Sequence, residues 1–121
     1  FGDAEFEILL FEFKAGVEAY LKTLGPSAPM KSLKDLIAFN EAHAKEEMPY
    51  FGQDLFLKSE AKGPLTDKTY LAAKAKARRL SRTEGLDKVL ASKKVDALIA
   101  PSGGPAWLTD LVNGDYGTGG S

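Results

Sequence analysis

The chain has 121 residues but no cysteine and only one histidine. The lack of cysteine excludes a disulfide framework, a thiolate zinc site and a cysteine nucleophile, and it is compatible with the cytoplasm. His43 and Glu47 stand four positions apart in a predicted helix, with Glu41 and Glu46 close by. A metal site normally needs a second histidine or further converging ligands. We therefore interpret His43 as a half-buried helix histidine beside a solvated acidic surface, and we expect no metal site.

No charge of one sign dominates the sequence, and it contains no long hydrophobic run. The 16 Lys and Arg residues nearly balance the 17 Asp and Glu residues, for a net charge of -1. Such a chain has no overall field that attracts nucleic acid or an anionic membrane. The basic residues between Lys74 and Arg82 spread around a predicted helix without accompanying aromatics, as on a solvated face. No apolar run approaches the roughly 20 residues of a membrane span. We expect neither a nucleic-acid partner nor a membrane partner.

What the sequence does contain is a series of amphipathic helices. Apolar residues three and four positions apart predict a helix over residues 3–24, followed by the helix-ending pair Gly25-Pro26. Its predicted buried face consists of Phe6, Leu9, Leu10, Phe13, Val17, Tyr20, Leu21 and Leu24. A second apolar stripe consists of Ile8, Phe11 and Ala15. A helix that is apolar on two sides needs covering on two sides, and we expect part of that cover to come from outside this chain.

Three more helices are predicted from start and stop signals. Ser32 and Asp35 resemble a capping box that opens a helix over residues 32–47, with Pro49 as its stop. A short helix is predicted around residues 54–61. The last helix begins with Thr66 as its cap and continues to about residue 94, with an interruption at Gly85.

The final quarter of the sequence no longer has the pattern of an amphipathic helix. Residues 95–100 (VDALIA) form a short apolar run that predicts a buried β-strand, and they lead into proline, serine and paired glycines. A lone strand needs partner strands for its backbone groups. Together with a start at Phe1 and an end at Ser121, this strand leads us to expect that residues 1–121 are a single segment of a larger domain.

Two glycine-rich stretches offer candidate chemistry. They are residues 102–104 (SGG) and residues 117–121 (GTGGS), and neither matches a phosphate-binding loop or a dinucleotide-binding fingerprint. Glycine-rich backbone can also form an oxyanion hole beside a serine nucleophile. Ordinary turns are the better explanation for any single Gly-Gly pair.

Several segments, taken in order, resemble the C-terminal half of amidase-signature enzymes. They are residues 1–14 (FGDAEFEILLFEFK), 36–41 (LIAFNE), 48–53 (MPYFGQ), 96–101 (DALIAP) and 113–115 (NGD). The resemblance covers nearly the whole chain. It implies an α/β parent enzyme with a mixed sheet flanked by helices, of which this chain is a mostly helical part with one strand near residues 95–100.

The resemblance also implies an activity. Amidase-signature enzymes hydrolyse carboxamides with a Ser–cis-Ser–Lys triad and use no metal or organic cofactor. That triad belongs to the N-terminal half of the family, so we expect it outside this chain and expect the chain to be inactive alone. The implied partners are the remainder of the amidase chain and a small amide or peptide amide substrate. In the family the loop after the matching strand approaches the substrate, which makes Ser102, Gly103, Gly104 and Trp107 candidate pocket-lining residues.

Two alternatives stay open from the sequence. In the first, Lys34, Ser102 and Ser121 imitate the family triad, because they stand in Lys-Asp, Ser-Gly-Gly and Gly-Gly-Ser contexts in the same order. Against this, the residues around all three match the C-terminal half, and Lys34 falls in the first turn of an amphipathic helix. In the second, the chain is a non-catalytic helical interaction module that binds through the second stripe of the first helix.

Overall fold

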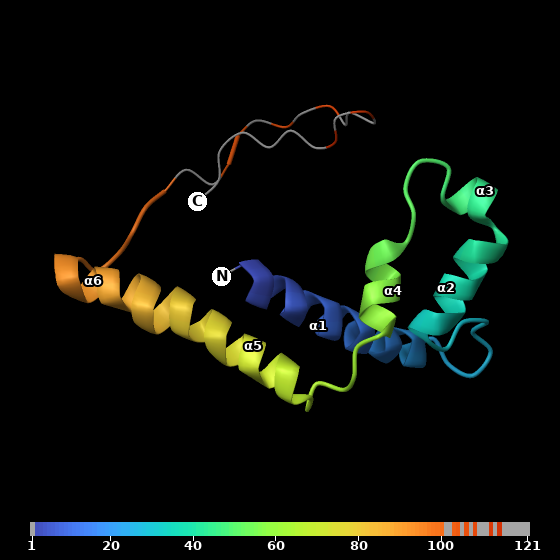
Figure 1. The fold of residues 1–121 in the computed structure, drawn as a ribbon, viewed down its shortest axis with the longest axis horizontal. Coiled ribbons are helices and arrows are strands. Elements are labelled where there is room, and N and C mark those ends of the chain that lie inside the picture. The colour runs from blue at the N-terminus through green and yellow to red at the C-terminus, as the bar shows by residue number, and fades with distance from the viewer. Residues whose placement is uncertain are drawn as a thin grey trace.

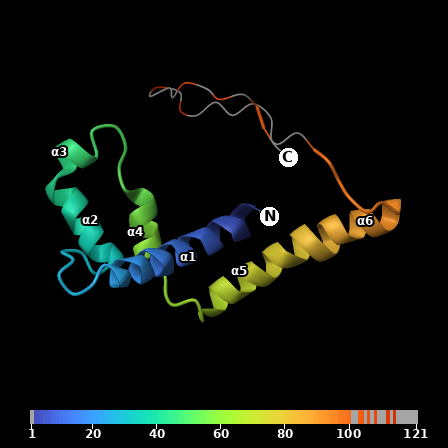
Figure 2. The same ribbon diagram turned by 180° about the vertical axis from the view of Figure 1, so that it is seen from behind.

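The computed structural model describes residues 2–100, together with residues 103, 104, 106, 108, 112 and 114. The regular elements of these residues are all helical. In chain order they are α1 (Gly2–Thr23), α2 (Leu33–Ala42), α3 (Ala44–Glu47), α4 (Asp54–Glu60), α5 (Lys68–Arg78), the π-helix η1 (Arg79–Leu86) and α6 (Asp87–Lys93). Elements α5, η1 and α6 form one rod that lies beside α1 and extends past its N-terminal end (Figure 1). Seen from behind, α4 still lies against α1, with α2 and α3 further along (Figure 2).

The core lies where α1 packs against α5 and α4. Phe11 of α1 and Tyr70 of α5 are both buried, and their ring centroids are 5.5 Å apart. Phe13 of α1 meets Phe56 of α4 with a centroid distance of 5.2 Å. Tilted aromatic pairs at such distances add stabilisation beyond the apolar area that they bury. Helix α1 is therefore the central element, with α5 and α4 on different sides of it.

The predicted helix over residues 3–24 is confirmed, and its predicted buried face is confirmed in part. Leu10 and Leu21 are buried and Phe13 packs on Phe56, but four of the eight residues of that face are exposed. Phe11 of the second stripe is covered by α5, whereas Phe6, Leu9 and Tyr20 of the first face are 43%, 50% and 63% exposed. Periodicity shows that a helix has an apolar stripe, but which stripe a neighbour covers depends on distant residues. Within the second stripe, Phe11 is thus covered by this chain, while Ile8 and Ala15 are half-buried, so less of that stripe is available to a partner than the interaction-module alternative expects.

The ends of the helices follow local chemistry. The capping box at α2 is confirmed, with the Asp35 amide donating to Ser32 Oγ at 3.2 Å and the Ser32 amide donating to Asp35 Oδ2 at 2.9 Å. The cap of α5 is Asp67 rather than Thr66, because Asp67 Oδ1 accepts from the Thr69 amide at 2.7 Å. The helix predicted over residues 32–47 is divided into α2 and α3 at His43.

The interruption predicted at Gly85 is also present. Gly85 has φ of -102° and ψ of -106°, which are not helical values, and it lies inside the wide turns of η1. A Cβ added at this glycine would lie 2.5 Å from the Leu80 carbonyl oxygen. Only glycine fits so close an approach of backbone to backbone, which explains its position in the rod.

The strand predicted over residues 95–100 is absent. The left-handed residue Lys94, with φ of 54°, ends α6, and the chain then leaves the helices as an irregular segment (Figure 1). Residues 96–100 make no hydrogen bond with any other described part of the chain, and Ile99 is 99% exposed. A strand exists only when a neighbouring strand supplies its hydrogen bonds, and residues 2–100 contain none.

Candidate functional site

The predicted pocket-lining residues fall at the edge of the described structure. Gly103 and Gly104 lie in exposed, irregular backbone, and apart from its two chain neighbours no described residue has an atom within 4 Å of a Cβ placed on Gly103. Ser102 and Trp107 lie outside the described residues. The role of these four residues in lining a pocket therefore stays a prediction.

Lys34 is exposed in the first turn of α2. Its two proposed companions, Ser102 and Ser121, lie outside the described residues, so the imitation triad also stays a prediction. The neighbouring Asp35 carboxylate accepts backbone hydrogen bonds from Lys31 at 2.8 Å and from Ser32 at 2.9 Å. These bonds, above all the one from Lys31, hold the pKa of Asp35 below its ordinary value because they stabilise the charged form. The charge at this helix start thus has a capping role.

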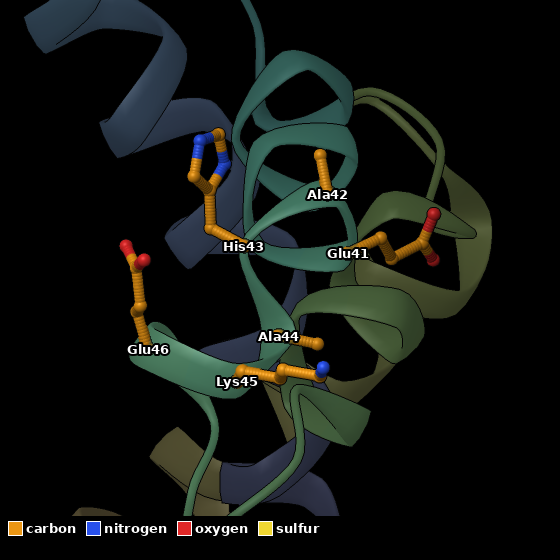
Figure 3. Close-up of a pocket in the computed structure, with 6 residues that line it drawn as sticks. All are labelled: Glu41, Ala42, His43, Ala44, Lys45 and Glu46. Carbon is orange, nitrogen blue, oxygen red and sulfur yellow. The ribbon is translucent and has the colours of Figure 1, made fainter.

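A shallow hollow lies at the junction of α2 and α3, around the single histidine (Figure 3). The side chains of His43 and Glu46 point to one side of the junction, and those of Glu41 and Lys45 point to the other. The His43 ring is exposed, stacks on Phe39 at a centroid distance of 4.1 Å, and places Nδ1 2.9 Å from the Phe39 carbonyl oxygen. These contacts close the end of α2, so His43 is a capping residue and is more exposed than the sequence suggested.

Among the residues that the structure describes, no group of three or more His, Cys, Asp or Glu side chains is arranged to hold a metal ion. The helices of the same residues are also too short or too polar to cross a membrane.

The principal polar network of the described chain joins α1 to the C-terminal end of α4, and sequence reasoning missed it. Lys14 Nζ donates to the carbonyl oxygens of Glu60 at 2.8 Å and Lys62 at 3.1 Å, at the C-terminal end of α4. Lys62 Nζ in turn pairs with Glu7 at 2.6 Å and lies 5.4 Å from the centre of the Phe11 ring. The partners are 46 to 55 positions apart in the sequence, so no local sequence pattern predicts these contacts. A lysine at a helix C-terminus satisfies free carbonyl groups and complements the helix dipole.

This arrangement of helices is present in solved amidases. The chain is 47% identical to the peptide amidase PAM in complex with the competitive inhibitor chymostatin, and the match has a TM-score of 0.87. It covers 99% of this chain and 24% of that one. The native peptide amidase from Stenotrophomonas maltophilia matches with 45% identity and a TM-score of 0.80, over 97% of this chain and 23% of the other.

A curated plant protein agrees with the solved structures. A probable amidase from Arabidopsis thaliana is 41% identical over 92 residues, which are 75% of this chain and 17% of the plant protein. None of the known protein-family models matches the chain. The chain therefore spans less than a quarter of the length of these relatives.

In both helical arrangement and sequence, the chain is similar to one segment of these amidases. The resemblance to the amidase-signature family is confirmed, and this chain corresponds to part of an amidase. The solved relatives that it matches are, more particularly, peptide amidases.

Proposed function

We propose that this chain forms part of an enzyme that hydrolyses carboxamides with a Ser–cis-Ser–Lys triad, and that the triad lies on amidase polypeptide outside these 121 residues. The observation that carries the proposal is the match to a peptide amidase over 99% of the chain at 47% identity. The proposal places the chain in the C-terminal half of an α/β parent with a mixed sheet.

The reaction of such an enzyme needs a nucleophile, a base and an oxyanion hole. The nucleophilic serine attacks the amide carbonyl while the lysine, acting through the bridging serine, takes up its proton. The same lysine returns the proton to the leaving nitrogen, and water then releases the acid from the acyl-enzyme. Backbone N–H groups stabilise the negative charge on the carbonyl oxygen. Neither a metal nor an organic cofactor enters these steps.

Within this scheme the chain supplies scaffold and pocket wall. Residues 96–100 have unused backbone donors and acceptors within the described structure, which supports their addition as a strand to a sheet of the parent enzyme. Ser102, Gly103, Gly104 and Trp107 would then follow the end of that strand and line the substrate pocket. The solved relatives are peptide amidases, which favours a peptide amide over a small amide as substrate.

A chimera tests the proposal. Residues 1–121 replace the matching quarter of the Stenotrophomonas maltophilia peptide amidase, and ammonia release from a peptide with a C-terminal amide is measured. We expect an active chimera, an inactive isolated chain, and unchanged chimera activity after Lys34→Ala.

Two results would contradict the proposal. Hydrolysis by the isolated chain that disappears on Lys34→Ala would assign catalysis to Lys34, Ser102 and Ser121. A folded but inactive chimera would favour a non-catalytic role for the chain.

A further inference from the structure

The π-helix η1 has little packing that would hold its backbone in place. None of its residues is buried, and the helices that it contacts within the described chain are α5 and α6, which precede and follow it in the same rod. Gly85 inside it has non-helical backbone angles. A segment with few buried contacts opens locally at a low cost in free energy. Residues 79–86 are therefore open to an enzyme that must unwind its substrate chain.

Ser81 lies in the first turn of η1 and follows a pair of arginines. The local sequence is Arg78-Arg79-Leu80-Ser81, so two guanidinium groups stand three and two positions before the hydroxyl. Among the described residues, Ser81 Oγ contacts the Arg78 carbonyl oxygen at 3.5 Å, and a hydrogen bond of that length is weak. The hydroxyl is therefore not tied to a strong partner.

Both arginines are available to an acidic partner. Arg78 is exposed and has no ion pair with any residue that the structure describes. Arg79 pairs with Glu84 at 2.5 Å, but the two side chains are 53% and 47% exposed. An exposed pair of this kind contributes little free energy, so another carboxylate can replace Glu84. Protein kinases use such charge patterns around a serine to select it as a substrate.

We propose that Ser81 is phosphorylated by a protein kinase that recognises Arg78 and Arg79, and that the phosphate changes the bend of the rod at Gly85. The kinase transfers the γ-phosphoryl group of ATP. The bond from that phosphorus to the β–γ bridging oxygen breaks, Ser81 Oγ bonds to the phosphorus, and ADP leaves. The hydroxyl proton passes to the catalytic carboxylate of the kinase.

The phosphate would alter the charges that surround the bend. It adds a charge of about -1.5 to -2 at neutral pH. Arg78 and Glu84 stand three positions before and after Ser81, so both are its neighbours on the helix surface. The phosphate attracts Arg78 and repels Glu84, which weakens the pair that Glu84 makes with Arg79. Because α6 and residues 95–100 follow η1 in the chain, the bend sets their direction (Figure 1).

Phosphorylation in vitro tests the site. The isolated chain is incubated with ATP and the catalytic subunit of cyclic-AMP-dependent protein kinase, which selects serines that follow an arginine pair at this spacing. Mass spectrometry should find one phosphate per chain, on Ser81, and none after Ser81→Ala. Ser92 is a control within the same rod, because Val89 and Leu90 stand where the arginines would be.

Two arginine variants separate recognition from stability. Arg79→Ala removes a recognition residue and should slow phosphorylation by about tenfold or more. Arg82→Ala is the matched control, since it breaks the other exposed ion pair of η1, with Asp87 at 3.2 Å, but lies after the serine. Equal slowing by both variants overturns the proposed recognition, and so does phosphate that persists after Ser81→Ala.

The chimera with the Stenotrophomonas maltophilia peptide amidase tests the site within a longer polypeptide. It should also be phosphorylated on Ser81, and this measurement does not depend on whether the chimera hydrolyses amides. A folded chimera in which Ser81 stays unmodified overturns the inference. A chimera that is phosphorylated but hydrolyses no amide supports it while contradicting the proposed catalytic function.

Spin labels test the effect on the bend. The chain has no cysteine, so Ala75→Cys in α5 and Ala91→Cys in α6, both at exposed positions, give two unique labelling sites. Phosphorylation should change the distance between the labels measured by double electron–electron resonance, and kinase treatment of the same protein with Ser81→Ala should not. A fully phosphorylated chain with an unchanged distance overturns the effect on the bend.

Discussion

The Tyr70 hydroxyl donates a 2.7 Å hydrogen bond to Glu12 Oε1 and so joins α5 to α1. The same hydroxyl accepts from Lys74 Nζ at 3.2 Å, while the Tyr70 ring packs on Phe11. One buried side chain thus combines an apolar contact and a polar contact between two helices. These two contributions can be separated by mutation.

Tyr70→Phe keeps the ring and removes the hydroxyl. It should lower the free energy of unfolding by about 1 to 2 kcal/mol, since a hydrogen bond to a charged group is lost. Tyr70→Ala also removes the ring and should cost about 3 to 5 kcal/mol. Urea denaturation followed by circular dichroism measures both values. Equal losses in the two variants would show that the hydroxyl, and not the packing of the ring, dominates.

Lys14→Met keeps the apolar stem but removes the ammonium group that caps α4. The carbonyl oxygens of Glu60 and Lys62 would lose their donor, and the Glu60 carboxylate would lose its counter-ion at 3.5 Å. We expect a loss of roughly 2 to 3 kcal/mol in unfolding free energy. Lys58→Met is the matched control, because Lys58 pairs with Asp54 in an exposed i, i+4 arrangement and should contribute less than about 0.5 kcal/mol. Similar losses in both variants would contradict a capping role for Lys14.

Asp35→Asn removes the charge from the capping box of α2. Because folding lowers the pKa of Asp35, its carboxylate stabilises the native state above the ordinary pKa of 3.8, and that stabilisation is lost as the pH falls through the lower folded pKa. The variant should therefore be less stable than the native chain at pH 7. This difference in stability, called the gap below, should disappear on acidification toward pH 2. Thermal unfolding at several pH values measures this gap. A gap independent of pH would show that the charge of Asp35 is not involved.

Gly85→Ala and Gly16→Ala should change stability in opposite directions. An alanine Cβ at position 85 would meet the Leu80 carbonyl oxygen at 2.5 Å, so the backbone of η1 must shift. At position 16 there is open space within a regular helix, and alanine should add about 0.5 to 1 kcal/mol. Both variants can be compared by thermal unfolding. Stabilisation by Gly85→Ala would contradict the close approach at the kink.

The sequence predicts best those features that depend on neighbouring residues. The capping box of Ser32 and Asp35 spans four positions and forms as expected, and Gly85 interrupts the helix where its backbone freedom is needed. The buried side of α1 could be predicted only in part: Leu10 and Leu21 are buried as expected, whereas the burial of Phe11 depends on Tyr70, a distant residue in the sequence. The segment 95–100 has the composition of a strand but lacks a partner in the described chain. For the candidate pocket, the predictions for Ser102 and Trp107 rest on the family resemblance alone.

The hydrogen bonds of α1 to α4 and α5 can form only after those later helices have been synthesised. Lys14 reaches carbonyl groups 46 and 48 positions later, and Glu12 meets Tyr70 58 positions later. At about 5 to 20 residues per second, ribosomes would need several seconds to deliver these partners after α1 has been made. Throughout that interval the most apolar helix of the chain would have no cover from α4 or α5. A nascent chain at this stage is therefore a natural client for chaperones that bind exposed apolar helices.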